Sequence, residues 1–121
     1  LPVAAQIAAD GVHLSAARLA ERGIEARVQR CRGWVGASCH SLAELQRAAA
    51  VGADFAVLAP VRCTPSHPDR QPLGWGGFAG LTAPAQLPVY ALGGLAAADR
   101  HTARGHGAQG VAAIRGLLPT A

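Results

Sequence analysis

Five short apolar runs, separated by helical segments, constrain the fold of this chain more than any other feature of the sequence. Each run is continuous rather than alternating, which is typical of parallel strands that are covered on both faces. Strand–helix alternation with short links predicts an α/β fold with a parallel sheet. The five candidate strands are Gly11–Leu14, Trp34–Ser38, Phe55–Val61, Val89–Leu92 and Val111–Ile114.

Helical patterns lie between the strands, and one has clear start and stop signals. Ser41 and Glu44 form a capping box, and Gly52 ends the segment. Residues 64–77 form the longest predicted loop. Trp75 and Phe78, three residues apart, are interpreted as core contacts of a short helix. The other predicted helices are Val3–Ala9, Ser15–Arg22 and Ala96–Ala103.

Two architectures fit this element order. The chain has 121 residues, 50% of them hydrophobic, which predicts one domain. A flavodoxin-like open sheet of five strands suits that length, whereas a (βα)8 barrel takes about 250 residues and three more strands. Because the chain does not start with Met, we expect it to be a piece of a longer protein.

The amino-acid composition limits the classes of partner that this chain is expected to bind. The net charge is +4 and every basic residue is Arg, but the arginines are scattered and aromatics make up only 4%, so no nucleic-acid partner is expected. No apolar run reaches about 18 residues, so no membrane span is expected. Three cysteines without a CxxC spacing (Cys31, Cys39 and Cys63) favour a reducing, cytoplasmic setting over disulfides or a zinc site.

The last two strands both end in glycine-rich turns, Val89–Gly94 and Gly110–Gly116. A (βα)8 barrel builds its phosphate site from the loops after its last two strands, and glycine lets the backbone approach an anion. The pattern therefore predicts a phosphorylated small molecule as ligand, bound by Gly93 and Gly94, with Arg115 within reach. The alternative is that the two glycines make a tight turn and that Arg115 is a surface charge.

Two further groups of residues could carry chemistry. Ser38 and His40 end the second strand, where α/β proteins bind ligands, and His40 could move a proton near neutral pH. The alternative is that His40 only hydrogen-bonds the start of the next helix. We interpret His13, among apolar neighbours, as a core histidine, and we place Asp10 and Asp54 at the opposite end of the strands.

The loop after the third strand holds the second group, Thr64, Ser66 and His67. Hydroxyls and an imidazole beside backbone N–H groups could hold an oxyanion, although ordinary turn chemistry gives the same residues. The sequence has no dinucleotide fingerprint, P-loop, nucleophile elbow or zinc-protease motif, and no carboxylate cluster for a divalent metal.

Taken together, six short motifs resemble the thiamine phosphate synthase/TenI family, over about residues 10–117. Three segments are most similar in sequence to the synthase-like domain that is fused behind a Nudix hydrolase in some bacteria: Ser66–Pro68, Leu73–Trp75 and Tyr90–Gly94. The motifs, in chain order, are Gly11–Leu14, Gly36–His40, Gly52–Phe55, Pro60–Ser66, Leu92–Gly94 and Gly107–Val111.

The resemblance implies a partial (βα)8 barrel, with this chain as strands four to eight and the C-terminal part of a longer protein. It implies that Ser38 lies near the substrates, that Thr64 and Ser66 hold the pyrimidine or its phosphates, and that His40 is the proton shuttle of the thiazole tautomerase branch. The thiazole-phosphate cup would be Gly93, Gly94, Ile114 and Arg115.

The chain also departs from the family pattern. Ser15–Arg18 replaces the Gly-Gln-x-Asp whose Asp binds Mg²⁺ in the synthases, so the Mg²⁺ implied for an intact parent has lost a ligand. His67 replaces the usual pyrophosphate-binding Lys, and Arg115 replaces a Ser. Losing charge neutralisation for a departing pyrophosphate weakens the case for the synthase reaction.

Three hypotheses follow. The first is a thiamine-biosynthesis transferase domain that binds thiazole phosphate and, in an intact parent, couples it to hydroxymethylpyrimidine pyrophosphate; the tautomerase is its alternative. The second is a non-catalytic phosphate-binding domain of a Nudix fusion. The third is a stand-alone half-barrel whose exposed sheet edges form a homodimer.

Overall fold

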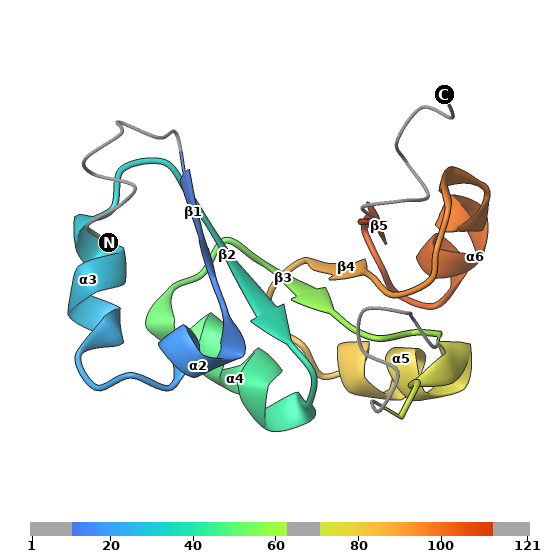
Figure 1. The fold of residues 1–121 in the computed structure, drawn as a ribbon, viewed down its shortest axis with the longest axis horizontal. Helices are drawn as coiled ribbons and strands as arrows, with labels where there is room; N and C mark the ends of the chain where they lie inside the picture. Colours follow the sequence, from blue (N-terminus) through green and yellow to red (C-terminus); the bar gives the residue numbers. More distant parts are fainter. Residues whose placement is uncertain (1–10, 63–70, 113–121) are drawn as a thin grey trace.

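The computed structural model describes residues 11–62 and 71–112, which form one parallel sheet with helices packed on it (Figure 1). The five strands lie side by side in chain order, and every neighbouring pair is parallel. They are β1 (Gly11–Leu14), β2 (Trp34–Cys39), β3 (Phe55–Leu58), β4 (Val89–Ala91) and β5 (Gly110–Val111).

Strand order separates the two predicted architectures. A flavodoxin-like sheet has the order 2-1-3-4-5, because its chain reverses direction at a switch point. The described sheet has no such reversal, so each new strand is added at the same edge. A sequential parallel order is that of a (βα)8 barrel, and the open doubly wound sheet is not what the described residues form.

Helices follow each of the first four strands. They are α2 (Ala16–Leu19), α3 (Ile24–Arg30), α4 (Leu42–Val51), α5 (Gly74–Thr82), the 3₁₀ turn η1 (Ala97–Asp99) and α6 (Arg100–Gly105). Among the described residues, no helix is both long and apolar enough to cross a membrane.

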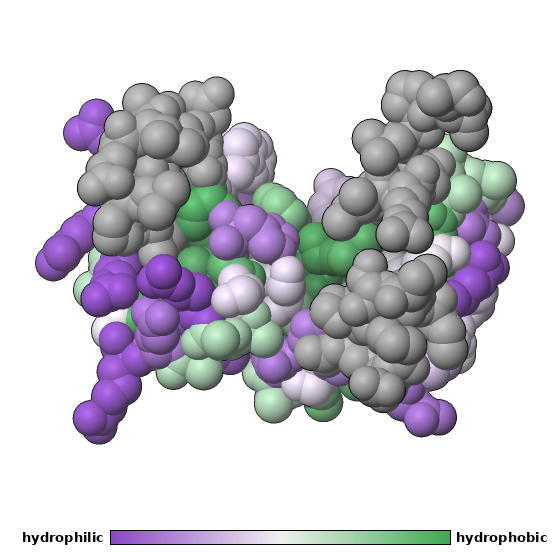
Figure 2. All heavy atoms as spheres, in the orientation of Figure 1, coloured by the Kyte–Doolittle hydropathy of each residue, from purple (hydrophilic) through white to green (hydrophobic). Residues whose placement is uncertain are grey.

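The two faces of the sheet differ, and we name them by their contacts. The covered face points into the core that the helices close, and its side chains are almost fully buried. The open face alternates with it along each strand, and Figure 2 shows hydrophobic side chains in the hollowed middle of the molecule, over β4 and β5. The covered face comprises Leu14, Val35, Ala37, Cys39, Ala56, Leu58, Val89 and Ala91; the open face comprises His13, Gly36, Ser38, Phe55, Val57 and Tyr90.

The predicted capping signals place α4 correctly. Ser41 Oγ accepts a hydrogen bond from Glu44 N at 3.2 Å, and Gly52 ends the helix in the left-handed conformation with φ of 92°. The capping box is shifted by one residue, because Glu44 Oε1 accepts from the backbone N–H of His40 at 2.6 Å rather than from Ser41.

Other boundaries differ from the predictions. The helix expected over Ser15–Arg22 stops at Leu19, and a second helix starts at Ile24, so that both Leu19 and Ile24 are buried. The expected strand Phe55–Val61 ends at Leu58, shortly before Pro60, which has no N–H to continue the ladder.

Two further predictions concern the segment after β3 and the chain start. Helix α5 begins at Gly74, inside the loop expected to run to Gly77, and Trp75 packs edge-to-face on the fully buried Phe78, which confirms the predicted core contact. The helix expected over Val3–Ala9 lies outside the described residues.

Candidate functional site

The candidate site lies at the carboxyl ends of β2, β3 and β4, where His40 is one of two anchored histidines. His40 follows β2 directly, and its ring Nδ1 lies 3.0 Å from the carbonyl oxygen of Ala59, after β3. Because a carbonyl can only accept, Nδ1 carries the proton, and Nε2 of the neutral ring is left as the basic nitrogen. The ring bonds across the sheet, while the backbone N–H of His40 bonds Glu44 in the first turn of α4, so the alternative proposed for His40 describes its backbone but not its ring.

The second anchored histidine is His13, and the expectation that it is a core residue is wrong. Its ring is exposed on the open face, where Nε2 shares a 2.6 Å hydrogen bond with Ser38 Oγ on the neighbouring strand. Partial burial still lowers the pKa of His13 below its usual value of 6.5, because desolvation disfavours the charged ring. A neutral imidazole therefore orients Ser38 near neutral pH.

A glycine makes room for this pair. A Cβ at Gly36 would stand 2.9 Å from His13 Nδ1 and 2.7 Å from Phe55 Cε2, and closer still to the tip of the Phe55 ring. Phe55 in turn packs edge-to-face on Tyr90, with ring centroids 5.7 Å apart. The open face thus carries a row of aromatic rings from β3 to β4, and the His13 ring lies beside the Phe55 ring.

The glycine turn after β4 is pressed against the backbone that follows β3. Gly93 has φ of 113° and Gly94 has φ of 66°, both in the left-handed region that favours glycine. A Cβ at Gly93 would stand 2.7 Å from Pro60 Cα and 2.8 Å from Val61 N. The backbone N–H groups of Val61 and Arg62 donate to Leu92 O and Gly93 O, at 2.9 and 3.1 Å.

The backbone N–H groups of this turn lack partners in the part of the chain that the structure describes. Within residues 11–62 and 71–112, the N–H groups of Gly93, Gly94 and Leu95 donate to no protein acceptor. Successive free N–H groups in left-handed turns form concavities that suit anions. The segment after β3 joins the parts of the site, since Ala59 holds His40 while Val61 and Arg62 hold the turn.

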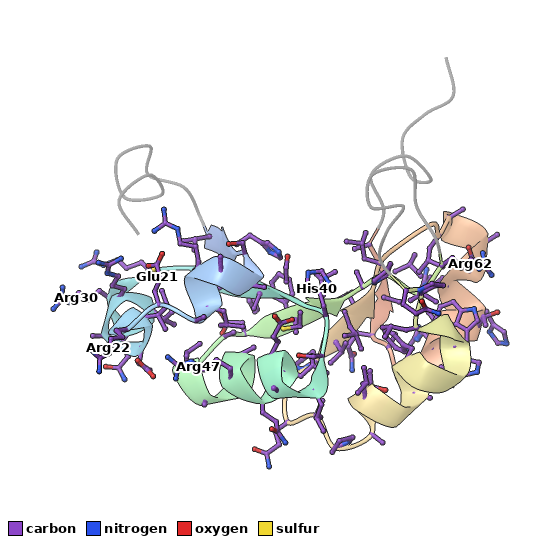
Figure 3. The ribbon with its side chains drawn as sticks, turned by 60° about the horizontal axis from the view of Figure 1, so that its bottom comes forward. Glu21, Arg22, Arg30, His40, Arg47 and Arg62 are labelled. Carbon is purple, nitrogen blue, oxygen red and sulfur yellow. The ribbon has the colours of Figure 1, made fainter. Side chains whose placement is uncertain are left out.

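The structure describes only part of the predicted site. Figure 3 shows His40 at the start of α4, and Ser38, Gly93 and Gly94 are also described. The rest of the predicted site lies outside the described residues: Thr64, Ser66, His67, Ile114 and Arg115. Sequence reasoning missed the contact that His13 makes, for which the available signal was a histidine one residue before the carboxyl end of a predicted strand.

The described residues do not fit a Mg²⁺ site. Ser15, where the synthase metal motif would begin, caps α2 by accepting from Arg18 N at 3.2 Å, and Arg18 lies 3.7 Å from the Glu21 carboxylate. Residues 11–62 and 71–112 contain no group of three metal-ligating side chains. Asp54 accepts from Val35 N at 2.7 Å, at the opposite end of the strands as predicted.

Comparison with known proteins supplies the family. The family model described as thiamine monophosphate synthase (TMP-TENI) matches residues 1–117. A putative thiamine-phosphate synthase of Aquifex aeolicus is 37% identical over 116 residues, covering 96% of this chain and 61% of that protein. The thiamine phosphate pyrophosphorylase structure from Pyrococcus furiosus superposes with a TM-score of 0.72 at 29% identity, covering 93% of this chain and 52% of that one.

The chain therefore spans little more than half the length of these relatives. A bifunctional ThiM/ThiE protein of Symbiobacterium thermophilum is 33% identical over 24% of its own length, which shows one relative inside a fusion; a Nudix fusion stays a prediction. With a family model matched over nearly all of its residues, the chain belongs to the thiamine monophosphate synthase (TMP-TENI) family.

Proposed function

We propose that this chain is a thiamine phosphate synthase-like domain that binds thiazole phosphate in thiamine biosynthesis. In an intact parent the bound thiazole phosphate would be coupled to hydroxymethylpyrimidine pyrophosphate. The observation that carries the proposal is the Gly93–Gly94 turn at the carboxyl end of β4, whose N–H groups have no acceptor within residues 11–62 and 71–112. Family membership supports the ligand class.

We also propose that the sheet is strands four to eight of a (βα)8 barrel. Its sequential parallel order supports this, as does the single helix-covered face, because the inner face of a barrel is closed by the barrel's own strands. The polar pair His13–Ser38 would then line the inside of the barrel near its carboxyl end, which is where barrel enzymes place their active sites.

Phosphate binding can be tested at Gly93. Titration of the wild-type chain with thiazole phosphate, and with inorganic phosphate as a minimal probe, is expected to show saturable binding. Gly93→Ala is expected to weaken binding by more than about tenfold, because a Cβ would collide with Pro60 and strain the turn. Gly105→Ala is the matched control, since a Cβ there meets nothing within 4 Å.

Circular dichroism and thermal melting of each variant separate loss of binding from loss of fold. Wild-type binding that survives in Gly93→Ala, with the fold intact, would remove the turn from the ligand site. Absence of any phosphate binding by the wild-type chain would refute the proposed function itself.

The tautomerase is a second candidate, favoured by the geometry of His40. With Nδ1–H held by Ala59 O, Nε2 is fixed as the group that could take up and return a proton. His40→Ala is expected to abolish tautomerisation of thiazole carboxylate phosphate while phosphate affinity is retained. His40→Gln tests the proton directly, because a Gln side chain can hydrogen-bond Ala59 but cannot shuttle a proton; unchanged turnover in either variant would exclude the shuttle.

A non-catalytic phosphate-binding domain is the third candidate, favoured by Arg18 at the position of the family Asp. Magnesium separates these alternatives. Synthase turnover in the intact parent is expected to require Mg²⁺, whereas binding of phosphate at the Gly93–Gly94 turn should be equal in EDTA. Mg²⁺-dependent coupling by the intact parent would contradict the non-catalytic assignment.

A further inference from the structure

We infer that Arg62 and Asp99 form a clamp that fixes the Gly93–Gly94 turn and keeps the Asp99 carboxylate from repelling the bound phosphate. Arg62 is the second residue of the segment that follows Pro60, and Asp99 is the last residue of η1. The two are 37 residues apart in sequence, yet they flank the turn that the proposed function assigns to phosphate. Neither residue belongs to the site predicted from the sequence.

The contact between the two side chains is two-pronged. Arg62 Nη2 lies 3.2 Å from Asp99 Oδ1, and Nη1 donates to Asp99 Oδ2 at 3.4 Å. Parallel contacts between a guanidinium and a carboxylate fix orientation as well as distance. The Asp99 side chain is 19% exposed against 51% for Arg62, so the carboxylate is the more restrained partner. Figure 3 places Arg62 beside α5 and α6, away from His40.

Each partner also holds the turn through a second contact. The backbone N–H of Arg62 donates to Gly93 O at 3.1 Å, on one side of the turn. On the other side, Asp99 Oδ2 accepts from Ala96 N at 2.9 Å. The ion pair therefore closes a ring that runs from Arg62 through Gly93 to Ala96 and Asp99. Opening it would remove the side-chain link between η1 and the segment after β3, leaving Gly93 held by the backbone N–H of Arg62 alone.

The charges give the clamp a second consequence. Asp99 accepts from the N–H of Ala96, the residue after Leu95, so an unpaired Asp99 carboxylate at this end of the turn would oppose the binding of an anion. Arg62 neutralises that carboxylate while leaving the donors of Gly93, Gly94 and Leu95 unused within the described residues. This part of the inference rests on the proposed function, whereas the ordering of the turn does not.

The test measures amide hydrogen exchange and phosphate affinity in the same variants of the full chain. Arg62→Met keeps the stem of the side chain and removes its charge. We expect the amides of Val61 and Ala96, which bond to Leu92 O and Asp99 Oδ2, to exchange about two- to fivefold faster, the range for a partly exposed ion pair. Inorganic phosphate should bind about two- to fivefold more weakly.

Asp99→Asn also breaks the ion pair, but it removes a negative charge where Arg62→Met removes a positive one. An Asn side-chain oxygen can still accept from Ala96 N, but the ion pair is lost, so exchange at Val61 should rise as in Arg62→Met. Phosphate should bind at least as tightly as to the wild type, because a negative charge has gone and Arg62 is released. The double variant should exchange no faster than Arg62→Met alone, since the two residues act through one contact.

Arg62→Lys and Arg104→Met complete the set. Lys keeps the charge but not the two-pronged geometry, so phosphate affinity should recover more than amide protection. Arg104→Met, on α6, makes the same charge change at an arginine with no ion pair among the described residues, and should alter neither readout.

Unchanged exchange in Arg62→Met, or exchange effects of Arg62 and Asp99 that add as if independent, would overturn the clamp. Equal phosphate affinity in Arg62→Met and Asp99→Asn would overturn its electrostatic part. If wild-type protein bound no phosphate, the proposed function would fall, and the exchange data alone would decide whether the clamp orders the turn.

Discussion

The two faces of the sheet are formed by the same strands but hold different kinds of side chain. On the covered face, Ala37, Ala56 and Ala91 are fully buried, and small side chains there let the helices approach closely. On the open face the alternate positions hold the His13–Ser38 pair and the Phe55–Tyr90 contact. One face thus stabilises the fold, while the other carries polar groups that packing alone does not require.

This contrast between the faces is hidden in the sequence pattern of the strands. Short strands with Gly36 and Val57 on the open face show no polar alternation, although within the described residues helices cover only one side. The sequence pattern indicated burial on both faces, as it would in a barrel whose interior is filled by side chains. Under the proposed barrel assignment, the open face is the surface that faces the inside of the barrel.

The largest expected effect is on the covered face. Leu58 is fully buried, so Leu58→Ala should reduce the free energy of unfolding by about 2–5 kcal/mol, measured by urea denaturation. Val57→Ala, at the neighbouring position on the open face, is the comparison and should cost about 1–2 kcal/mol. Val57 is itself only 8% exposed, so a loss there as large as that at Leu58 would break the contrast by showing that both faces are equally packed within the chain.

A smaller effect is expected from overfilling the open face. Gly36→Ala should cost about 1–3 kcal/mol, because its Cβ would collide with the Phe55 ring and with His13. Gly110→Ala is the matched control on the same sheet, since a Cβ there meets the Tyr90 ring at an ordinary 3.6 Å. Its change in stability should stay within about 0.5 kcal/mol.

The origin of the Gly36 effect can be checked with a double variant. Phe55→Leu removes the ring atoms that the new Cβ would meet, so Gly36→Ala combined with Phe55→Leu should cost less than the sum of the two single changes. Strict additivity would contradict the proposed collision and would attribute the loss to backbone conformation instead.

Short-range sequence patterns were enough to predict where the main helices and strands of this fold lie. Ser41, Glu44 and Gly52 define α4 through bonds within a few residues of each other, and the structure confirms that helix. The strand positions also follow from short apolar runs, to within a few residues at their ends. Strand order needed the family resemblance, because nothing local in a five-strand chain distinguishes a sequential sheet from a doubly wound one.

The site was less predictable, because its contacts join distant residues. His13 and Ser38 meet across 25 residues, and no pattern within either strand shows that their face lacks a helix. The start of α5 was missed for a different reason: Gly74, Gly76 and Gly77 resemble a loop, and only the burial of Phe78 makes the segment helical. Tertiary packing decided both cases.

The smallest expected effect is a pH dependence of stability that arises from His13 on the open face. Because the pKa of His13 is lowered in the folded chain, the unfolded chain takes up a proton first as the pH falls below about 6.5. The stability that neutral His13 contributes is thus fully present above that pH and is lost as the pH falls through the folded pKa. The loss should be modest, since the ring is partly exposed.

His13→Gln should flatten this part of a plot of urea midpoint against pH, while keeping a hydrogen bond to Ser38 within reach. His101→Gln, at an exposed histidine on α6, is the matched control. If His13→Gln left the profile as steep as in the wild type, the acid sensitivity would have to come from other groups, and His13 would no longer distinguish the open face from the covered one.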